Sequence, residues 1–331
     1  MSKRGYLFFF LLIVTALLIN GCGGLKIKIG PESKEPLKEY TLQGTERGKV
    51  LVIPVRGFIS DSPRKDFLGE RASMVQEIVS QLRLAEKDEE IKAVLLEINS
   101  PGGSTTASDI LYHELIEFKE RTKTKIVAGL MDVAASGGYY IALSADRIVA
   151  HPTTITGSVG VIIITPKVTG LMDKLGLAVE VNKSGEEKDI VSPFRPSTPE
   201  EQKIFQELTD RMGKKFLDLV GTQRKMDPAV LSSVSTARIY LADEALQMKL
   251  VDQIGYLSDA IAAAKEMAGL SKEAKVVVYR REKYSNDNLY NMSSALHSGG
   301  SLSLLDLNLS EIVPTLSPGF YYLWAPGAAS N

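Results

Sequence analysis

The apolar residues of this chain gather in short runs that alternate with longer segments, in which apolar positions recur every three or four residues. A short apolar run between turn residues is typical of a buried strand, and the wider spacing is typical of an amphipathic helix. The pattern predicts strands at 49–55, 93–99, 126–131, 147–150, 156–164 and 177–181. It predicts helices at 66–88, 106–119, 139–145, 199–225 and 257–268. Strands that alternate with helices indicate an α/β fold with a largely parallel sheet.

The N-terminal segment 1–21 differs in character from the rest of the chain. A basic start precedes a largely apolar run from Tyr6 to Ile19, and a small residue follows it. These three features together are the signature of a signal peptide. The run is also shorter than the roughly 20 residues that a membrane-spanning helix needs.

Cys22, the only cysteine of the chain, directly follows Gly21. This arrangement resembles a bacterial lipobox, which implies cleavage before Cys22 and acylation of its thiol. The alternative is an uncleaved N-terminal anchor, since Asn20 is not the commonest residue at its lipobox position. Both alternatives leave the bulk of the protein outside the cytoplasm and tethered to a membrane. A lone cysteine also excludes an intrachain disulfide bond.

The remaining chain divides into three parts. Residues 22–48 are rich in Gly, Pro, Lys and Glu, and we expect them to form a tether to the body. Residues 49–270 carry the α/β pattern. In 271–331 the periodicity fades into a Ser-, Asn- and Leu-rich tail that closes on aromatic residues at 320–324. This aromatic end could form a core strand, contact the membrane or resemble a substrate; we expect packing or self-trimming.

Composition and charge exclude several classes of function. The net charge is −1 and no basic patch stands out, so nucleic-acid binding has no support. The His, Cys, Asp and Glu residues form no metal-ligand pattern, so we expect neither a metal ion nor another cofactor. A hydrophobic content of 44% with 24% charged residues is ordinary for a globular protein.

Ser136 and Lys188 are the candidates for catalysis. Ser136 lies in a turn of small residues after the strand expected at 126–131. A serine hydroxyl becomes a good nucleophile when a neighbouring base takes its proton, and a lysine can do so only as the neutral amine. Ser-Lys pairs are a known variant of the Ser-His-Asp arrangement. The three histidines lie in no setting that suggests a base, so the sequence predicts a serine hydrolase without a histidine triad.

Two glycine turns are candidates for an oxyanion hole, which needs N–H donors aimed at the developing charge. The Gly137 N–H follows the nucleophile at a strand-to-helix turn, where free N–H groups are available. The Gly103 N–H, after the strand at 93–99, is the candidate for the second donor. Taken alone, a Gly-Gly pair is more often a plain turn. Neither a Gly-x-Ser-x-Gly elbow nor a phosphate loop is present.

Four motifs occur in the order found in one peptidase family. They are Asn99-Ser100-Pro101-Gly102-Gly103, Ala134-Ala135-Ser136-Gly137-Gly138-Tyr139-Tyr140-Ile141-Ala142, Thr156-Gly157-Ser158-Val159-Gly160-Val161 and Lys188-Asp189-Ile190-Val191-Ser192-Pro193. Together they closely resemble the signal peptide peptidase SppA family, in its short bacterial form with a single repeat. The resemblance runs over about 49–269, and the tail at 318–324 also looks like that of the family. It implies a ClpP/crotonase-like ββα superhelical fold and cleavage of remnant signal peptides within their apolar segments.

Carried over position by position, the resemblance implies a role for each motif residue. Ser136 matches the nucleophile, Lys188 the general base, and Ser158 the serine that hydrogen-bonds the lysine. Gly103 and Gly137 match the oxyanion hole. The resemblance also implies a homo-oligomeric ring at a membrane, in which half-length members pair the serine of one protomer with the lysine of its neighbour. Because this chain has a single copy of each motif, we expect a shared site.

Three alternatives stay open at this stage. Lys183 lies close to Lys188 and competes with it, although it could equally be a solvated charge or bind a carboxylate. A crotonase-type acyl-CoA enzyme would use the same paired N–H groups, but export argues against it because CoA is cytoplasmic. A catalytically silent scaffold would keep the fold alone, and the intact Ser136 and Lys188 argue against that.

Overall fold

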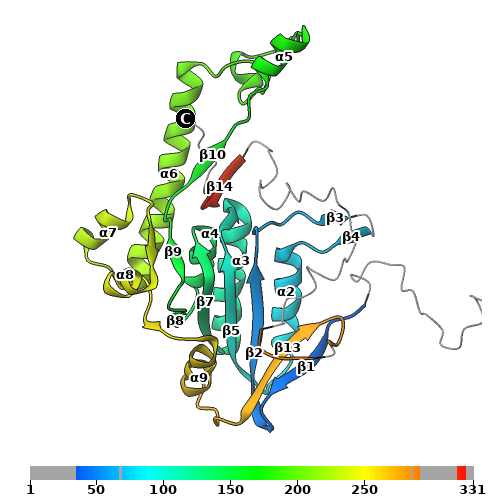
Figure 1. Ribbon diagram of the computed structural model, residues 1–331, viewed down its shortest axis with the longest axis vertical. Coiled ribbons are helices and arrows are strands. Elements are labelled where there is room, and N and C mark those ends of the chain that lie inside the picture. Colours follow the sequence, from blue (N-terminus) through cyan, green and yellow to red (C-terminus); the bar gives the residue numbers. More distant parts are fainter. Residues whose placement is uncertain (1–34, 67–68, 285, 291–318, 326–331) are drawn as a thin grey trace, which may run out of the picture.

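The computed structural model describes residues 35–66, 69–284, 286–290 and 319–325, and its centre is a nine-stranded sheet (Figure 1). The main path runs β1–β13–β2–β5–β7–β8–β12, and β9 extends from β7 to pair with β11. Neighbours pair in parallel except β1 with β13 and β11 with β9. The strands are β1 Lys38–Gln43, β2 Glu46–Arg56, β5 Ile91–Ser100, β7 Lys125–Ala135, β8 Arg147–Ala150, β9 Ile155–Gly157, β11 Ile239–Leu241, β12 Gln253–Ile254 and β13 Ala274–Arg280.

Helices bury both faces of this sheet. The helices α2 (Met74–Ala85), α3 (Thr105–Thr122) and α4 (Gly137–Ala142) pack on one face, and α9 (Leu257–Met267) packs on the other. Successive side chains of a strand point to opposite faces, so a strand covered on both sides is apolar throughout. The apolar runs of β2, β5 and β7 accordingly contribute to both layers of the core. The expected α/β fold with a largely parallel sheet is confirmed.

The helix expected at 66–88 begins later than its sequence pattern indicated. The Ser73 Oγ accepts a hydrogen bond from the Gln76 N–H at 3.1 Å, and the Gln76 side chain accepts one from the Ser73 N–H at 3.0 Å. This reciprocal capping box sets the start of α2. Before it, β3 (Arg64–Asp66) and β4 (Gly69–Arg71) pair as an antiparallel hairpin.

Parts of the expected tether and tail belong to the main sheet. The strand β1 and the start of β2 lie within 22–48, and β13 lies within 271–331. The strand β13 lies between β1 and β2, and its side chains Val276 and Val277 are fully buried, one in each of the two core layers. The sheet therefore begins before residue 49 and continues after residue 270. The expected signal peptide and Cys22 lie outside the described residues.

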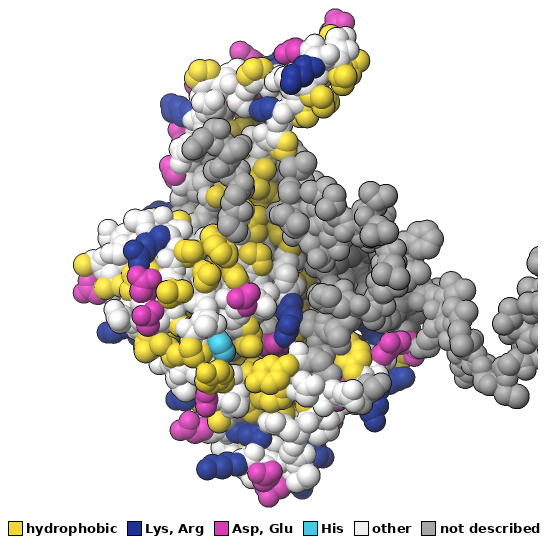
Figure 2. Space-filling view, in the orientation of Figure 1, with side chains coloured by type: hydrophobic (Ala, Val, Ile, Leu, Met, Phe, Trp, Pro, Cys, Tyr) yellow, Lys and Arg dark blue, Asp and Glu magenta, His cyan; other side chains and the backbone are white. Residues whose placement is uncertain are grey.

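Residues 165–198 form an arm that extends from the body, with α5 (Thr169–Leu175) at its far end (Figure 1). A 3-10 turn, η2 (Glu186–Asp189), follows, and the 26-residue helix α6 (Pro199–Arg224) leads back. None of the arm residues is buried, and Figure 2 shows apolar side chains at the surface of its outer part. The strand expected at 177–181 is not formed, because this stretch pairs with no described strand.

A three-stranded sheet adjoins the carboxyl end of the main sheet. Its middle strand, β14 (Gly319–Leu323), is antiparallel to both β6 (Gly102–Ser104) and β10 (Ile162–Ile164). The aromatic end of the chain thus returns to the turns that follow β5 and β9. The short helices α7 (Pro228–Val234) and α8 (Ala242–Gln247) flank β11. Within the described ranges, no helix is both long enough and apolar enough to cross a membrane.

Candidate active site

Ser136 stands at the turn from β7 to α4 in a backbone conformation that few residues adopt. Its φ of 52° and ψ of −115° lie outside the regions favoured by residues with a side chain. Its N–H donates to the Gly157 carbonyl at 2.8 Å, and its carbonyl accepts from the Tyr140 N–H at 2.8 Å. Ser136 is only 1% exposed, and its Oγ has no hydrogen-bond partner among the described residues. Backbone hydrogen bonds therefore fix the position of Ser136, while its buried hydroxyl is left unpaired in the described part of the chain.

The two glycine turns meet beside Ser136. A Cβ on Gly102, whose φ is 104°, would lie 2.8 Å from the Gly137 nitrogen, so this approach of two backbones requires glycine. Gly103, the other expected donor, follows on β6, where a Cβ would lie 2.1 Å from the Ile59 carbonyl oxygen. The fold therefore brings the Gly103 turn and the Gly137 turn to the same place as the serine.

Ser158 lies next to the same turn. It follows Gly157, whose carbonyl accepts the Ser136 N–H, and it is 8% exposed. Its own N–H donates to the Arg238 carbonyl at 2.8 Å. Ser158 also lines a pocket of about 370 Å³ that β10 forms with residues 323–325. The expected site residues other than the lysine therefore share one region of the protomer.

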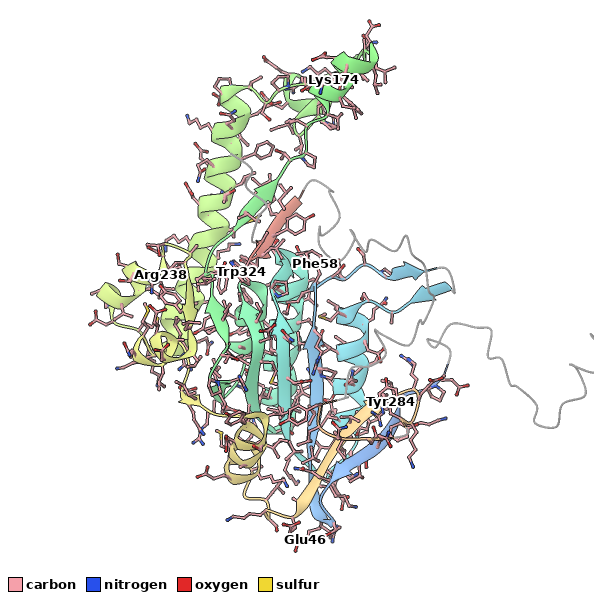
Figure 3. All side chains as sticks on the ribbon, viewed as in Figure 1. Glu46, Phe58, Lys174, Arg238, Tyr284 and Trp324 are labelled. Atoms are coloured by element: carbon pink, nitrogen blue, oxygen red, sulfur yellow. The ribbon has the colours of Figure 1, made fainter. Side chains whose placement is uncertain are left out.

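Lys188 is not among them within one protomer. It is exposed on η2 of the arm, and its side chain makes no hydrogen bond or ion pair with the described residues. The helix α4, which starts after Ser136, packs chiefly on α3, β5, β6, β7 and β14. Figure 1 shows the arm extending away from α4, and Figure 3 labels Lys174 towards its far end. The expected base and the expected nucleophile are thus held apart.

Lys183, the competing base, is already paired. Its Nζ donates to the Asp189 Oδ1 and to the Glu186 carbonyl, each at 2.7 Å. Arg195 binds Asp189 as well, and hydrogen bonds from Arg195 and then Lys183 hold the pKa of Asp189 well below its ordinary value. Both hydrogen bonds tie the Lys183 side chain to the 3-10 turn itself. Of the two lysines, Lys188 is the one whose amine is free.

The aromatic segment β14 lies between the glycine turn at β6 and the strand β10. Tyr322 lies opposite Gly103 in the β14–β6 pair, and the Trp324 N–H donates to the Pro101 carbonyl at 2.8 Å. A Cβ on Gly102 would lie 2.0 Å from the Tyr322 carbonyl oxygen, so this carbonyl rests against the turn that carries the expected donors. Of the alternatives considered for this segment, the protomer shows packing against the site.

The ring of Tyr322 enters an aromatic pocket formed by α3, α4 and α6. It stacks on Tyr140 with centroids 5.0 Å apart, and it is tilted against Phe216 at 4.8 Å. Tyr112 contacts Tyr140 edge-on at 5.5 Å, and the Tyr140 hydroxyl donates to the Asp109 Oδ1 at 2.7 Å. Sequence reasoning missed this pocket because its members lie far apart in the chain and share no local pattern.

Other charged residues are paired in ways that indicate structure. Asp146 accepts a hydrogen bond from the Ile126 N–H at 2.8 Å and pairs with Lys119 at 3.4 Å, and Arg147 pairs with Glu266 at 3.4 Å. In the part of the chain that the structure describes, no three His, Cys, Asp or Glu side chains are placed to hold a metal ion.

Comparison with known proteins identifies the family. The model of Peptidase family S49 matches residues 118–271, and that of Clp protease matches residues 67–156. A candidate signal peptide peptidase SppA of Enterococcus faecium is 34% identical over 255 residues, which cover 77% of this chain and 74% of that protein. The chain belongs to the SppA family. As a member of this family it is a serine peptidase, which replaces the acyl-CoA alternative.

Two longer proteases match over a similar share of the chain. The chloroplastic serine protease SPPA of Arabidopsis thaliana is 32% identical over 73% of this chain and 36% of its own length. Protease 4 of Haemophilus influenzae is 31% identical over 75% of this chain and 39% of its own length. Among solved structures, a ClpP1 mutant from Listeria monocytogenes covers 63% of this chain and 94% of its own, with a TM-score of 0.41 and 17% identity. The Clp protease match and the layered parallel sheet agree with the ClpP-like fold expected of the family.

Proposed function

We propose that this SppA-family peptidase is a membrane-tethered endopeptidase that cleaves apolar peptides, remnant signal peptides among them, through a Ser136–Lys188 dyad. The observation that carries the proposal is the Ser136 hydroxyl, buried and without a partner in the described residues, at a strained turn beside two glycine turns. An activated nucleophile needs such a fixed position with N–H donors at hand. The SppA-type relatives support peptide-bond cleavage.

In the proposed reaction, the Ser136 Oγ attacks the carbonyl carbon of the scissile bond while the neutral Nζ of Lys188 takes the hydroxyl proton. The N–H groups of Gly103 and Gly137 stabilise the oxyanion, and one such donor is worth about 3 kcal/mol in comparable sites. The C–N bond then breaks, and the Lys188 ammonium returns its proton to the leaving amine. Water, deprotonated by the same lysine, hydrolyses the acyl-enzyme. Ser158 orients the amine through a hydrogen bond.

The C-terminal strand β14 supports apolar peptides as substrates. It lies as an extended strand between β6 and β10, with the Tyr322 carbonyl against Gly102 and its ring in the aromatic pocket. A peptide with a large apolar side chain at this position would bind in the same way, by strand addition. We propose that the enzyme also trims itself after Tyr322. Mass spectrometry should then find chains ending at Tyr322 in the wild type but not in Ser136→Ala; identical ends would contradict self-trimming.

The arm supports an active site shared between protomers. Lys188 is exposed on the arm, and the arm extends away from α4, the helix that Ser136 precedes. The arm also carries large apolar side chains that are between 47% and 62% exposed: Leu171, Leu175, Leu177, Val179, Val181 and Phe194. Exposed apolar surface of this kind marks contacts with proteins or membranes. A head-to-tail contact with a second copy would bury it and carry Lys188 to the neighbour's serine, and such contacts close into rings.

Rings assembled from two variants test both the Ser136–Lys188 dyad and the proposal that two protomers contribute one residue each. Ser136→Ala rings and Lys188→Ala rings should each be inactive. Rings that contain both variants should regain activity, because some interfaces combine an intact Ser136 with an intact Lys188. Native mass spectrometry follows the exchange, and cleavage of an apolar peptide follows activity. Mixed rings that stay inactive after confirmed exchange would assign both residues to one protomer, and activity in either pure variant would refute the dyad.

The N-terminus supports a location at a membrane, with the catalytic domain outside the cytoplasm. Cys22 offers the acceptor thiol for a lipid, and the residues between it and β1 are long enough to act as a tether. Cys22→Ser should block acylation and shift the protein from the membrane fraction to the soluble fraction. If mass spectrometry finds residues 1–21 intact on the mature protein, the segment is an uncleaved anchor instead.

A further inference from the structure

We propose that Arg195 is a positioning residue that fixes the turn carrying Lys188, and thereby sets where the amine lies in the assembled site. This inference rests on the proposed Ser136–Lys188 chemistry. Lys188 itself contacts no described side chain through a hydrogen bond or ion pair, and its turn lies on an exposed arm. Since misplacing a catalytic group by about 1 Å can cost on the order of 100-fold in rate, the turn needs a restraint.

Arg195 binds the residue next to Lys188 at several points. Its Nε and Nη2 donate to the Oδ2 and Oδ1 of Asp189, both at 2.8 Å. Its Nη2 also donates to the Asp189 carbonyl at 3.3 Å. A bidentate guanidinium–carboxylate pair fixes orientation as well as distance. Because side chain and backbone of Asp189 are both held, the adjacent backbone of Lys188 is restrained too.

The same guanidinium joins this turn to α6. Its Nη1 donates to the Oε2 of Glu201 at 3.0 Å, and its Nη2 donates to the Oε1. Glu201 is buried and completes a capping box with Thr198, through hydrogen bonds of 2.8 and 3.1 Å. Further along α6, Phe216 is fully buried in the core. A continuous set of contacts therefore runs from the core through α6, Glu201 and Arg195 to the turn of Lys188.

Arg195 also keeps Asp189 from binding the Lys188 amine. Both carboxylate oxygens of Asp189 are occupied, by Arg195 and by the Lys183 ammonium. The other charged side chains of the 3-10 turn, both exposed, are those of Glu186 and Glu187. Without Arg195, Asp189 would be a less neutralised anion beside a lysine that has to be neutral to act. The effect of Arg195 is therefore electrostatic as well as geometric.

Kinetics of the full-length, assembled enzyme test this role. Arg195→Ala should lower kcat on an apolar peptide by about 10-fold to 100-fold, with KM within about twofold, because the groove is untouched. Its kcat should rise at a higher pH than in the wild type, since Asp189 then favours the ammonium. Millimolar guanidinium should restore part of the rate. Arg195→Lys keeps the charge but not the two-point geometry, so it should recover only part of the activity.

Arg121→Ala is the matched control. Arg121 also joins two carboxylates, those of Glu86 at 2.8 Å and Glu117 at 3.1 Å, but it does so on the body of the protein. This variant should keep the wild-type kcat and show no effect of guanidinium. The positioning role would be overturned if Arg195→Ala had the kcat and pH profile of the wild type. It would also be overturned if Arg195→Ala lost activity and neither added guanidinium nor the Arg195→Lys substitution restored any of it.

Two further variants complete the test. If Arg195→Ala does not assemble, Glu201→Gln replaces it. This variant weakens the contacts between Arg195 and position 201 while keeping the shape of the side chain. A wild-type kcat in Glu201→Gln would also overturn the positioning role. Lys188→Ala separates this inference from the proposed function. An active Lys188→Ala would refute the dyad itself. An inactive Lys188→Ala beside an unaffected Arg195→Ala would refute only the role of Arg195.

Discussion

The ring of Tyr322 stacks on the ring of Tyr140, with centroids 5.0 Å apart and planes inclined by 20°. Tyr140 belongs to the helix that follows Ser136, whereas Tyr322 comes from the C-terminal strand. The contact thus joins a substrate-like strand to the element that carries the proposed nucleophile. Under the proposed function, a peptide that binds along β6 has to displace β14 to reach Ser136.

Tyr322→Ala should therefore make the groove easier to enter. An aromatic pair contributes roughly 0.5–1.5 kcal/mol beyond its buried area, so losing the stack weakens the hold on β14. We expect KM for an apolar peptide to fall by about tenfold, which corresponds to about 1.4 kcal/mol, with kcat unchanged. Tyr290→Ala is the control, because Tyr290 is 64% exposed. Steady-state kinetics in which Tyr322→Ala keeps the wild-type KM would show that β14 does not compete with substrate.

Ser136→Ala and Lys188→Ala should each lower kcat by about four orders of magnitude or more, because a nucleophile and its base act as a unit. Lys183→Ala should keep most of the activity, since its ammonium is bound to Asp189. A fluorophosphonate probe gives an independent readout, expected to label Lys183→Ala but not Ser136→Ala. Near-normal turnover by Lys188→Ala would mean that another group is the base.

Gly102→Ala should disable the site through the backbone. The new Cβ would lie 2.0 Å from the Tyr322 carbonyl oxygen and 2.8 Å from the Gly137 nitrogen, at a φ of 104° that disfavours alanine. The strand β14 can leave the groove, but the Gly137 N–H has to shift. We expect kcat to fall by about 100-fold.

The control for this change is Gly213→Ala. Gly213 lies inside α6 with no atom within 4 Å of its would-be Cβ, so alanine should stabilise the helix by up to about 1 kcal/mol and leave kcat unchanged. Thermal melts and kinetics of both variants distinguish the two effects. Wild-type kcat in Gly102→Ala would argue against an oxyanion hole at these turns.

The contacts that hold the Lys188 turn should resist acid. Hydrogen bonds from Arg195, and after them one from Lys183, hold the pKa of Asp189 below its ordinary value of 3.8. Hydrogen bonds from Arg195 likewise hold the pKa of Glu201 below its ordinary value of 4.5. A lowered carboxyl pKa adds stability that is complete above the ordinary pKa and is lost as the pH falls towards the folded value. The contacts of Arg195 with Asp189 and Glu201 should therefore persist at neutral and alkaline pH and be lost only below about pH 4. Hydrogen exchange at 186–201, corrected for intrinsic rates, checks this; protection lost near pH 6 would contradict it.

The local pattern of apolar residues was sufficient to predict the strands that are buried on both faces of the sheet. The strands β2, β5 and β7 are covered on both faces, so their apolar runs stand out in the sequence. The turns at Ser136 and Gly103 were recognisable because small residues follow a strand end. The choice of Lys188 over Lys183 came from a motif, and the pairing of Lys183 with Asp189 now supports it on physical grounds.

Features set by distant contacts could not be predicted in this way. The alternating apolar residues Leu177, Val179 and Val181 resemble a half-buried strand, yet within one protomer they are exposed. The position of β14 depends on contacts such as the hydrogen bond from the Thr105 hydroxyl to the Phe320 carbonyl, between residues 215 positions apart. A contact between segments so far apart in the chain leaves no local periodicity in the sequence, because the position of β14 is set by the strands and side chains that it packs against.

The backbone of Ser136 has one more consequence. Its conformation costs a residue with a side chain about 1–3 kcal/mol. Glycine would avoid that cost, while losing roughly 0.5–1 kcal/mol through greater freedom of the unfolded chain. Ser136→Gly should therefore melt at a higher temperature than the wild type, whereas Ser136→Ala should not. Glycine at position 136 would thus give a more stable chain without the proposed nucleophile, so the strain at this position is a cost of the proposed activity.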